Sequence, residues 1–164
     1  MLFSARSTKG VTRLSSSDRA LVTLPDEVKE VLIGILLGDA HIVRRSPSAN
    51  SRLVYAQTAV KHKEYFDYVL SYFVPFCVND YTPQSRLVVD NRTKKTYSAI
   101  SFTTMQLPCF NVFRELFYLS NVKVVPNNIY DLLTPIGLAF WIMKTFWIVK
   151  TFKTSKITLK CYPQ

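Results

Sequence analysis

The stretch LIGILLGDAH, Leu32–His41, decides how the rest of the chain is interpreted. It is apolar and helix-like, and an aspartate stands near its end. A helix C-terminus carries the negative end of the helix dipole, so an anion in the last turn is disfavoured by roughly 0.3–1 kcal/mol. The bases that suit such a position, Arg44 and Arg45, follow just beyond it. Asp39 is therefore poorly placed for stability, which indicates another use for it, such as holding a cation.

The composition is that of one globular domain of 164 residues, with 48% hydrophobic and 20% charged residues. A net charge of +10 favours a polyanionic partner, either nucleic acid or an acidic membrane surface. The cysteines at 77, 109 and 161 form no CxxC pair, which predicts reduced thiols. His41 and His62 form no metal-ligand spacing with them. The apolar segment 132–143 is shorter than the roughly 20 residues that span a bilayer, so a core helix is predicted there.

Hydrophobic patterns predict an α+β fold, in which four antiparallel strands are covered on one face by helices. Residues 1–24 are predicted to be a basic, disordered segment, and residues 1–17 have the composition of either a mitochondrial transit peptide or an ordinary basic tail. The predicted elements are helix 25–39, strands 40–45 and 52–60, helix 64–74, strands 85–90 and 96–104, and helix 109–119. A last apolar helix opens with Thr134 as N-cap and Pro135 at its first position, so an internal repeat begins there.

Polar and basic residues alternate with apolar ones in the predicted strands. Such side chains bind phosphates and base edges, and a two-stranded β-ribbon fits the major groove of DNA. A solvated sheet face would show the same alternation, but the net charge of +10 favours DNA. The candidate contacts are Arg44, Arg45, Arg52, Tyr55, Gln57, Lys61, Arg86, Arg92, Lys94, Lys95, Tyr97 and Ser101.

Two segments carry a resemblance to a known family. LIGILLGDA, residues 32–40, resembles the signature helix of LAGLIDADG homing endonucleases, with Asp39 at the position of its final, catalytic aspartate. KVVPNNIYDLLTP (123–135) and GLAFWIM (137–143) resemble the stretch that leads into the second signature helix. The likeness is to the monomeric, two-motif branch encoded by fungal mitochondrial introns. It implies an αββαββα half with a four-stranded saddle sheet in residues 25–133, and the start of a second repeat.

The resemblance also implies a site-specific double-stranded DNA endonuclease that hydrolyses phosphodiester bonds with a divalent metal, here magnesium (Mg²⁺), in mitochondria. Its two signature helices pack through small residues, here Gly34 and Gly38. Asp39 would be the catalytic residue and a metal ligand, together with the backbone carbonyl of Gly38. Lys123 matches a family position near the scissile phosphate, where it would polarise the attacking water or offset transition-state charge.

The chain departs from the family pattern after Met143. The pattern calls for Asp-Asp-Gly, and Lys144, Thr145 and Phe146 stand there instead. Thr145 occupies the place of the second catalytic aspartate, and a neutral hydroxyl is a poor ligand for a divalent metal. Residues 134–164 are therefore interpreted as an incomplete second signature helix with a divergent basic tail, caused by a frameshift, gene degeneration or an alternative splice end.

Three hypotheses follow from these features. The chain is a monomeric endonuclease by descent, whose own cleavage activity is in question. Alternatively, it is a homodimer in which two copies of Asp39 rebuild the site. In the third hypothesis it is a non-catalytic nucleic-acid binder or an intron RNA maturase, which needs the basic surface but not Asp39.

Overall fold

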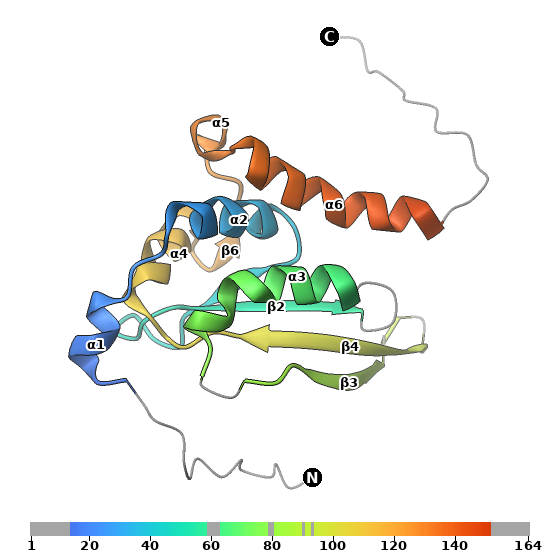
Figure 1. Cartoon of the computed structure of the whole chain (residues 1–164), viewed down its shortest axis with the longest axis horizontal. Helices are drawn as coiled ribbons and strands as arrows, with labels where there is room; N and C mark the ends of the chain where they lie inside the picture. Colours follow the sequence, from blue (N-terminus) through green and yellow to red (C-terminus); the bar gives the residue numbers. More distant parts are fainter. Residues whose placement is uncertain (1–13, 59–62, 79–80, 90, 93, 152–164) are drawn as a thin grey trace, which may run out of the picture.

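The computed structural model describes residues 14–58, 63–78, 81–89, 91–92 and 94–151, and for residue 84 and residues 144–151 it describes the backbone alone (Figure 1). The helices are α1 Ser16–Leu21, α2 Asp26–Leu37, α3 Lys63–Phe73, α4 Asn111–Phe117, α5 Ile129–Leu132 and α6 Pro135–Thr151, with short 3₁₀ helices at Val74–Phe76 and Pro108–Phe110. The strands are β1 His41–Val43, β2 Arg52–Thr58, β3 Gln84–Val89, β4 Thr96–Thr103, β5 Tyr118–Leu119 and β6 Val122–Lys123.

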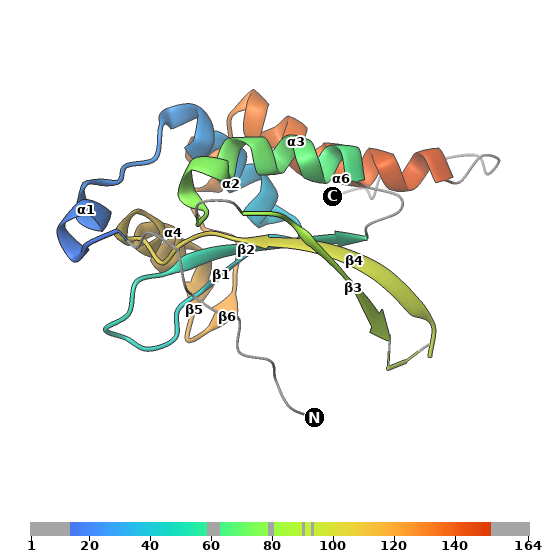
Figure 2. The same cartoon turned by 60° about the horizontal axis from the view of Figure 1, so that its bottom comes forward.

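The predicted α+β architecture is confirmed. Strands β1 to β4 form one antiparallel sheet in the order β1-β2-β4-β3, and the chain runs from α2 to α4 in the order αββαββα. Helices α2, α3 and α6 lie on one side of this sheet, and no helix of the described chain covers its other side (Figure 2). The two sides are called the helix-covered face and the open face below.

Aromatic rings join α3 to the helix-covered face. Tyr55 of β2 and Phe102 of β4 are paired across the strands, and both rings contact Phe66 of α3 at centroid distances of 5.9 and 5.6 Å. Phe73, two helical turns further along α3, stacks on Phe102 as well. All four side chains are almost completely buried, so the core lies between α3 and the two central strands.

Helices α2 and α6 cross at a pair of glycines. A Cβ atom on Gly34 would collide with the carbonyl oxygen of Gly137 and would lie 3.0 Å from Cβ of Phe140. A Cβ atom on Gly137 would lie 3.0 Å from the carbonyl oxygen of Glu30. Gly34 was predicted as a packing residue and lies at the crossing. Gly34 meets Gly137 of α6 there. Gly38 was also predicted as a packing residue, but it is the C-cap of α2, beyond the last turn of the helix.

Three elements differ from the sequence prediction. Helix α1 lies inside the segment that was predicted to be disordered, and Ser15 and Asp18 close a capping box at its start. The hairpin β5–β6 and the short helix α5 were not predicted. The N-cap at Thr134 is confirmed, since its Oγ1 accepts a hydrogen bond from the backbone N–H of Gly137. Within the described chain, no helix combines the length and apolar content that a membrane span requires.

Replacing Gly34 by alanine should destabilise the protein, although alanine has the higher helix propensity. The added methyl group meets backbone atoms of α6, which cannot rotate away, so the two helices must separate. We expect the free energy of unfolding, measured by urea denaturation, to fall by about 1–3 kcal/mol.

The control is Ala139→Gly at an exposed position of α6, which should cost about 1 kcal/mol through helix propensity alone. A Gly34→Ala protein that is as stable as the wild type would contradict the close crossing of α2 and α6.

Candidate active site at the C-terminus of α2

Asp39 lies in the tight turn that follows α2. The N–H groups of Gly38 and Ala40 both bond to the carbonyl oxygen of Ile35, at 3.0 and 3.1 Å, so the chain leaves the helix in one turn and enters β1. The backbone of Gly38 adopts φ −101° and ψ −126°. Ala40 is completely buried, and Asp39 between these two residues is exposed. The turn therefore anchors its backbone on the core and presents a carboxylate outside it.

Lys123 supplies the cation that the end of α2 requires. Its Nζ donates to the carbonyl oxygen of Gly38 at 3.0 Å and to that of Ala40 at 2.7 Å. A positive charge on the last carbonyl groups of a helix interacts favourably with the helix dipole. The ammonium group also lies beside the residue that carries the Asp39 carboxylate. The structure thus brings together the two residues that the family resemblance marks as catalytic, although 84 positions separate them.

The hairpin β5–β6 places Lys123 at this point. Tyr118 and Lys123 form a cross-strand pair, and Ser120 and Asn121 make the connecting turn with positive φ values of 47° and 68°. The sequence predicted helix up to residue 119, but α4 ends at Phe117. Two strands of two residues each show no hydrophobic period, so no pattern in the sequence indicated this hairpin.

Gln57 of β2 orients the carboxylate. Its Nε2 donates to Oδ2 of Asp39 at 3.0 Å and to the hydroxyl oxygen of Tyr55 at 3.1 Å. Gln57 was predicted as a DNA contact, but it points to the helix-covered face, where it reaches the end of α2.

The oxygen atoms at this turn fit a hard cation such as Mg²⁺. Magnesium is usually bound by one or two carboxylates together with phosphate oxygens and water. Asp39 supplies one carboxylate, and the carbonyl oxygen of Gly38 keeps a second lone pair beside its bond to Lys123. Among the residues that the structure describes, no three His, Cys, Asp or Glu side chains come together as a metal cage.

The predicted contacts in β2 lie on opposite faces. Successive side chains of a strand alternate between the two sides of its sheet. Arg52 therefore points to the open face, whereas Tyr55 and Gln57 point to the helix-covered face. Tyr55 is 2% exposed, and burial raises the pKa of its hydroxyl far above the usual value. The prediction that Tyr55 contacts DNA is therefore wrong, because this side chain belongs to the core.

Other predicted contacts do gather on the open face. The strand register places Ser101 beside Ala56, and Arg86 beside Ala99, so Arg86, Tyr97 and Ser101 share the face of Arg52. Arg86 and Tyr97 are exposed. Arg92, Lys94 and Lys95 are exposed at the connection between β3 and β4.

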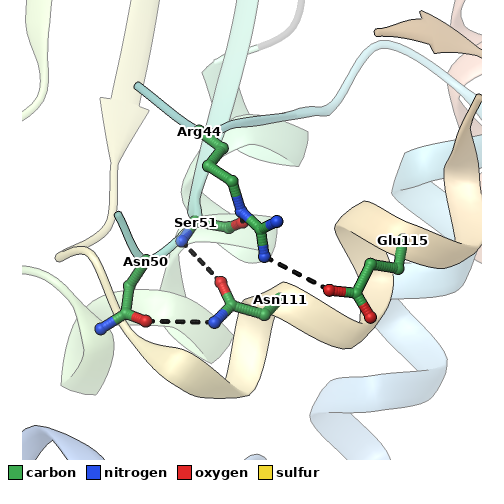
Figure 3. Close-up of polar contacts among 5 residues, drawn as sticks. All are labelled: Arg44, Asn50, Ser51, Asn111 and Glu115. Atoms are coloured by element: carbon green, nitrogen blue, oxygen red, sulfur yellow. Dashed lines mark hydrogen bonds and ion pairs between the residues drawn. The ribbon is translucent and has the colours of Figure 1, made fainter. Parts of the chain in front are cut away.

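Arg44 has intramolecular partners. Its Nε donates to Oγ of Ser51 at 3.3 Å, and its Nη2 lies 3.4 Å from Oε1 of Glu115 on α4 (Figure 3). Asn111 accepts from the N–H of Ser51 at 2.8 Å and donates to Asn50 at 3.1 Å. These contacts tie the β1–β2 connection to α4. Arg45, by contrast, is exposed.

Several predicted positions lie outside this description. Lys61, His62 and Cys161 fall on residues that the structure does not describe, and Thr145 lies in α6 where only the backbone is described. Cys77 and Cys109 are free thiols, and burial raises the pKa of each to about 11. Gly137 was missed as a packing residue, although Ile-Gly occurs in both apolar helices, at 33–34 and at 136–137.

Comparison with known proteins identifies relatives of this chain. The model of the LAGLIDADG DNA endonuclease family matches residues 29–163, a range that continues past Met143 into residues where the sequence showed no family pattern. The chain is 33% identical over 122 residues to "Cytochrome b mRNA maturase bI2" of Debaryomyces hansenii, covering 73% of this chain and 45% of the relative. It is 28% identical over 126 residues to "DNA endonuclease I-ChuI" of Chlamydomonas applanata, covering 73% and 57%.

A further relative is the bI2 maturase of Saccharomyces cerevisiae, 27% identical over 144 residues, with 82% of this chain and 33% of the relative covered. The chain thus spans between a third and somewhat over half of the curated relatives it matches. Among solved structures, the homing endonuclease I-WcaI bound to its DNA recognition sequence shares the fold, with a TM-score of 0.68 and 20% identity. That match covers 82% of this chain and 59% of the other.

Replacing Lys123 by methionine should destabilise the end of α2. The substitution keeps an apolar stem but removes the cation from two carbonyl groups and from the helix dipole. We expect the free energy of unfolding in urea to fall by about 1 kcal/mol. Lys63→Met is the control, because Lys63 makes an exposed pair with Asp67 within α3, and its loss should change stability little. Equal effects of the two substitutions would refute the capping role of Lys123.

Proposed function

The chain belongs to the LAGLIDADG DNA endonuclease family, and on that premise we propose that it is a site-specific endonuclease that hydrolyses phosphodiester bonds of double-stranded DNA. The observation that carries the proposal is the meeting of Asp39 and Lys123 at the end of α2. A carboxylate for a metal and an ammonium group for a phosphate are the two charges that this hydrolysis needs at one place.

Asp39 would hold Mg²⁺ there, with phosphate oxygens of the DNA as further ligands and with the Gly38 carbonyl within the same turn. When bound, the metal would activate water and stabilise the leaving oxygen. Gln57 holds the Asp39 carboxylate in one orientation, which is the usual task of a residue behind a metal ligand. Lys123 would stabilise the negative charge that develops on the phosphate in the transition state.

The open face of the sheet would bind the DNA. Arg52, Arg86, Tyr97 and Ser101 share this face, and Lys94 and Lys95 extend it at the β3–β4 connection. Arginine and lysine neutralise phosphates, and arginine, tyrosine and serine can also bond base edges. The net charge of +10 suits such a partner. Arg45 and Lys61 belong to the same proposal.

Intron RNA binding, as in a maturase, is the second candidate function. Two relatives are named as cytochrome b mRNA maturases, and the basic open face does not depend on Asp39. The same two names support a mitochondrial location, which stays a proposal.

Asp39→Asn should abolish cleavage while DNA binding is retained. The amide has the shape of the carboxylate but lacks its charge, so metal-dependent hydrolysis should fall by about two orders of magnitude or more. Cleavage of a plasmid library would be measured with Mg²⁺ and with EDTA, which should abolish the wild-type reaction.

Two other outcomes would contradict the endonuclease proposal. Undiminished cleavage by Asp39→Asn would refute the role of Asp39. If the wild-type chain prefers structured intron RNA to duplex DNA and cuts neither with Mg²⁺, the maturase proposal replaces the endonuclease proposal.

Arg86→Ala should weaken DNA binding, whereas Tyr55→Phe should leave it unchanged. Arg86 is exposed on the open face, so its loss should weaken binding and reduce the slope of log K against log salt concentration by about 1. Tyr55→Phe alters only the core-facing hydroxyl, and the affinity should stay within about twofold of the wild type, as expected for a residue that DNA does not contact. Fluorescence anisotropy at several salt concentrations measures both. A larger loss of affinity with Tyr55→Phe than with Arg86→Ala would contradict the assignment of the open face.

A further inference from the structure

The chain that leaves α2 is held at alternate backbone positions by side chains of α4 and the β5–β6 hairpin. Lys123 bonds to the carbonyl oxygens of Gly38 and Ala40. Two residues after Ala40, the N–H of Ile42 donates to the hydroxyl oxygen of Tyr118 at 3.0 Å. The carbonyl oxygen of Ile42 accepts from Nη1 of Arg114 at 2.7 Å. Residues 38, 40 and 42 are thus all bonded by side chains of α4 and of the β5–β6 hairpin.

Ile42 needs these partners because β1 is an edge strand. In the sheet order β1-β2-β4-β3, β1 pairs with β2 alone among the described strands, so none of these strands lies beside the other edge of its backbone. Unpaired N–H and C=O groups at a sheet edge must find other partners or water. Ile42 is 1% exposed, and Tyr118 and Arg114 satisfy its two outward-facing groups.

Arg114 connects this edge to the turn of the hairpin. Its Nη2 donates to Oδ1 of Asn121 at 2.6 Å, and its guanidinium carbon lies 3.8 Å from the centroid of the Tyr118 ring. A planar guanidinium group can make both bonds and the ring contact at once, which a lysine cannot. Arg114 therefore bonds to β1 and to the β5–β6 turn simultaneously.

The same hairpin determines where Lys123 lies. Tyr118 and Lys123 are directly paired across the two strands, and Val124 N–H bonds to the carbonyl oxygen of Phe117 at 2.8 Å. A displacement of the hairpin relative to β1 would therefore move the Lys123 ammonium relative to Asp39. Small displacements at a reacting centre are costly, and a shift of about 1 Å can reduce a rate 100-fold.

We propose that Arg114, together with Tyr118 and Asn121, is a positioning residue that fixes the distance between Asp39 and Lys123. This inference rests on the proposed endonuclease function. None of the three side chains needs to touch DNA or metal. They act through the backbone of residues 38–42 and through the β5–β6 pairing that places Lys123. They should therefore affect the rate of cleavage and not the affinity for DNA.

Arg114→Lys and Asn121→Gly test the proposal in the full chain. Glycine suits the positive φ of 68° at residue 121, so this variant removes the acceptor of Arg114 without straining the turn. At saturating protein, the single-turnover cleavage rate should fall about 10- to 100-fold for Arg114→Lys and less for Asn121→Gly, with Kd for DNA nearly unchanged. Combined with Lys123→Ala, Arg114→Lys should reduce the rate little further, because both changes remove the same arrangement.

Glu115→Gln is the matched control. Glu115 is the next residue of α4 and pairs with Arg44. In the described structure, none of its hydrogen bonds or ion pairs reaches residues 38–42. Its cleavage rate should equal that of the wild type. If the positioning variants lower only the melting temperature or raise only the Kd for DNA, and leave the single-turnover rate at the wild-type value, the proposal is overturned.

A measurement that needs no cleavage separates this proposal from the proposed function. The ammonium signal of Lys123 in proton–nitrogen correlation spectra can be assigned by its loss in Lys123→Arg. It should move or broaden in Arg114→Lys and Asn121→Gly, and it should stay in place in Glu115→Gln. If the wild type does not cut DNA but the signal behaves in this way, the endonuclease proposal fails while the positioning of Lys123 stands. An unchanged signal in both variants would overturn the positioning proposal whatever the activity.

Discussion

The ammonium group of Lys123 on the last carbonyl groups of α2 is the contact on which the candidate site depends. An aspartate at a helix C-terminus adds negative charge where the dipole is already negative. Lys123 offsets that charge without removing the carboxylate, because it binds the backbone on either side of Asp39. The aspartate is therefore tolerated in the fold at this position. Lys123 therefore explains how the chain can carry an aspartate at the end of α2.

Close packing of α2 and α6 is the second constraint. Two glycines at the crossing allow backbone to approach backbone, and Tyr65 of α3 donates to the carbonyl oxygen of Phe140 at 2.7 Å, which joins α6 to the layer above the sheet. Side chains at the crossing would separate the two helices. The ends of α2 and of the segment before α6 would then separate too, and this segment includes the hairpin that carries Lys123.

Local patterns predicted the elements that have a clear period or a cap, such as α2 with its acidic first turn and α6 with its cap at Thr134. The sequence also allowed the prediction that Arg52 and Tyr55 face opposite sides of the sheet, because they are three positions apart in one strand. The β5–β6 hairpin could not be predicted, because strands of two residues show no hydrophobic period. The bond of Lys123 to Gly38 joins residues 85 positions apart, and only the family resemblance suggested that the two regions meet.

Strand β2 contributes side chains to both faces of the sheet, and this limits the mutations that the strand can accept. Its odd-numbered side chains support the core and, through Gln57, the carboxylate of Asp39, whereas its even-numbered side chains from Arg52 onward face the open side. If the open face binds DNA as proposed, substitutions at even positions would change the contact surface without touching Gln57 or Asp39. A one-residue insertion within β2 would exchange the two sets and disturb both. Strand β2 can therefore change one face by point mutation, whereas a change of its length would alter both faces.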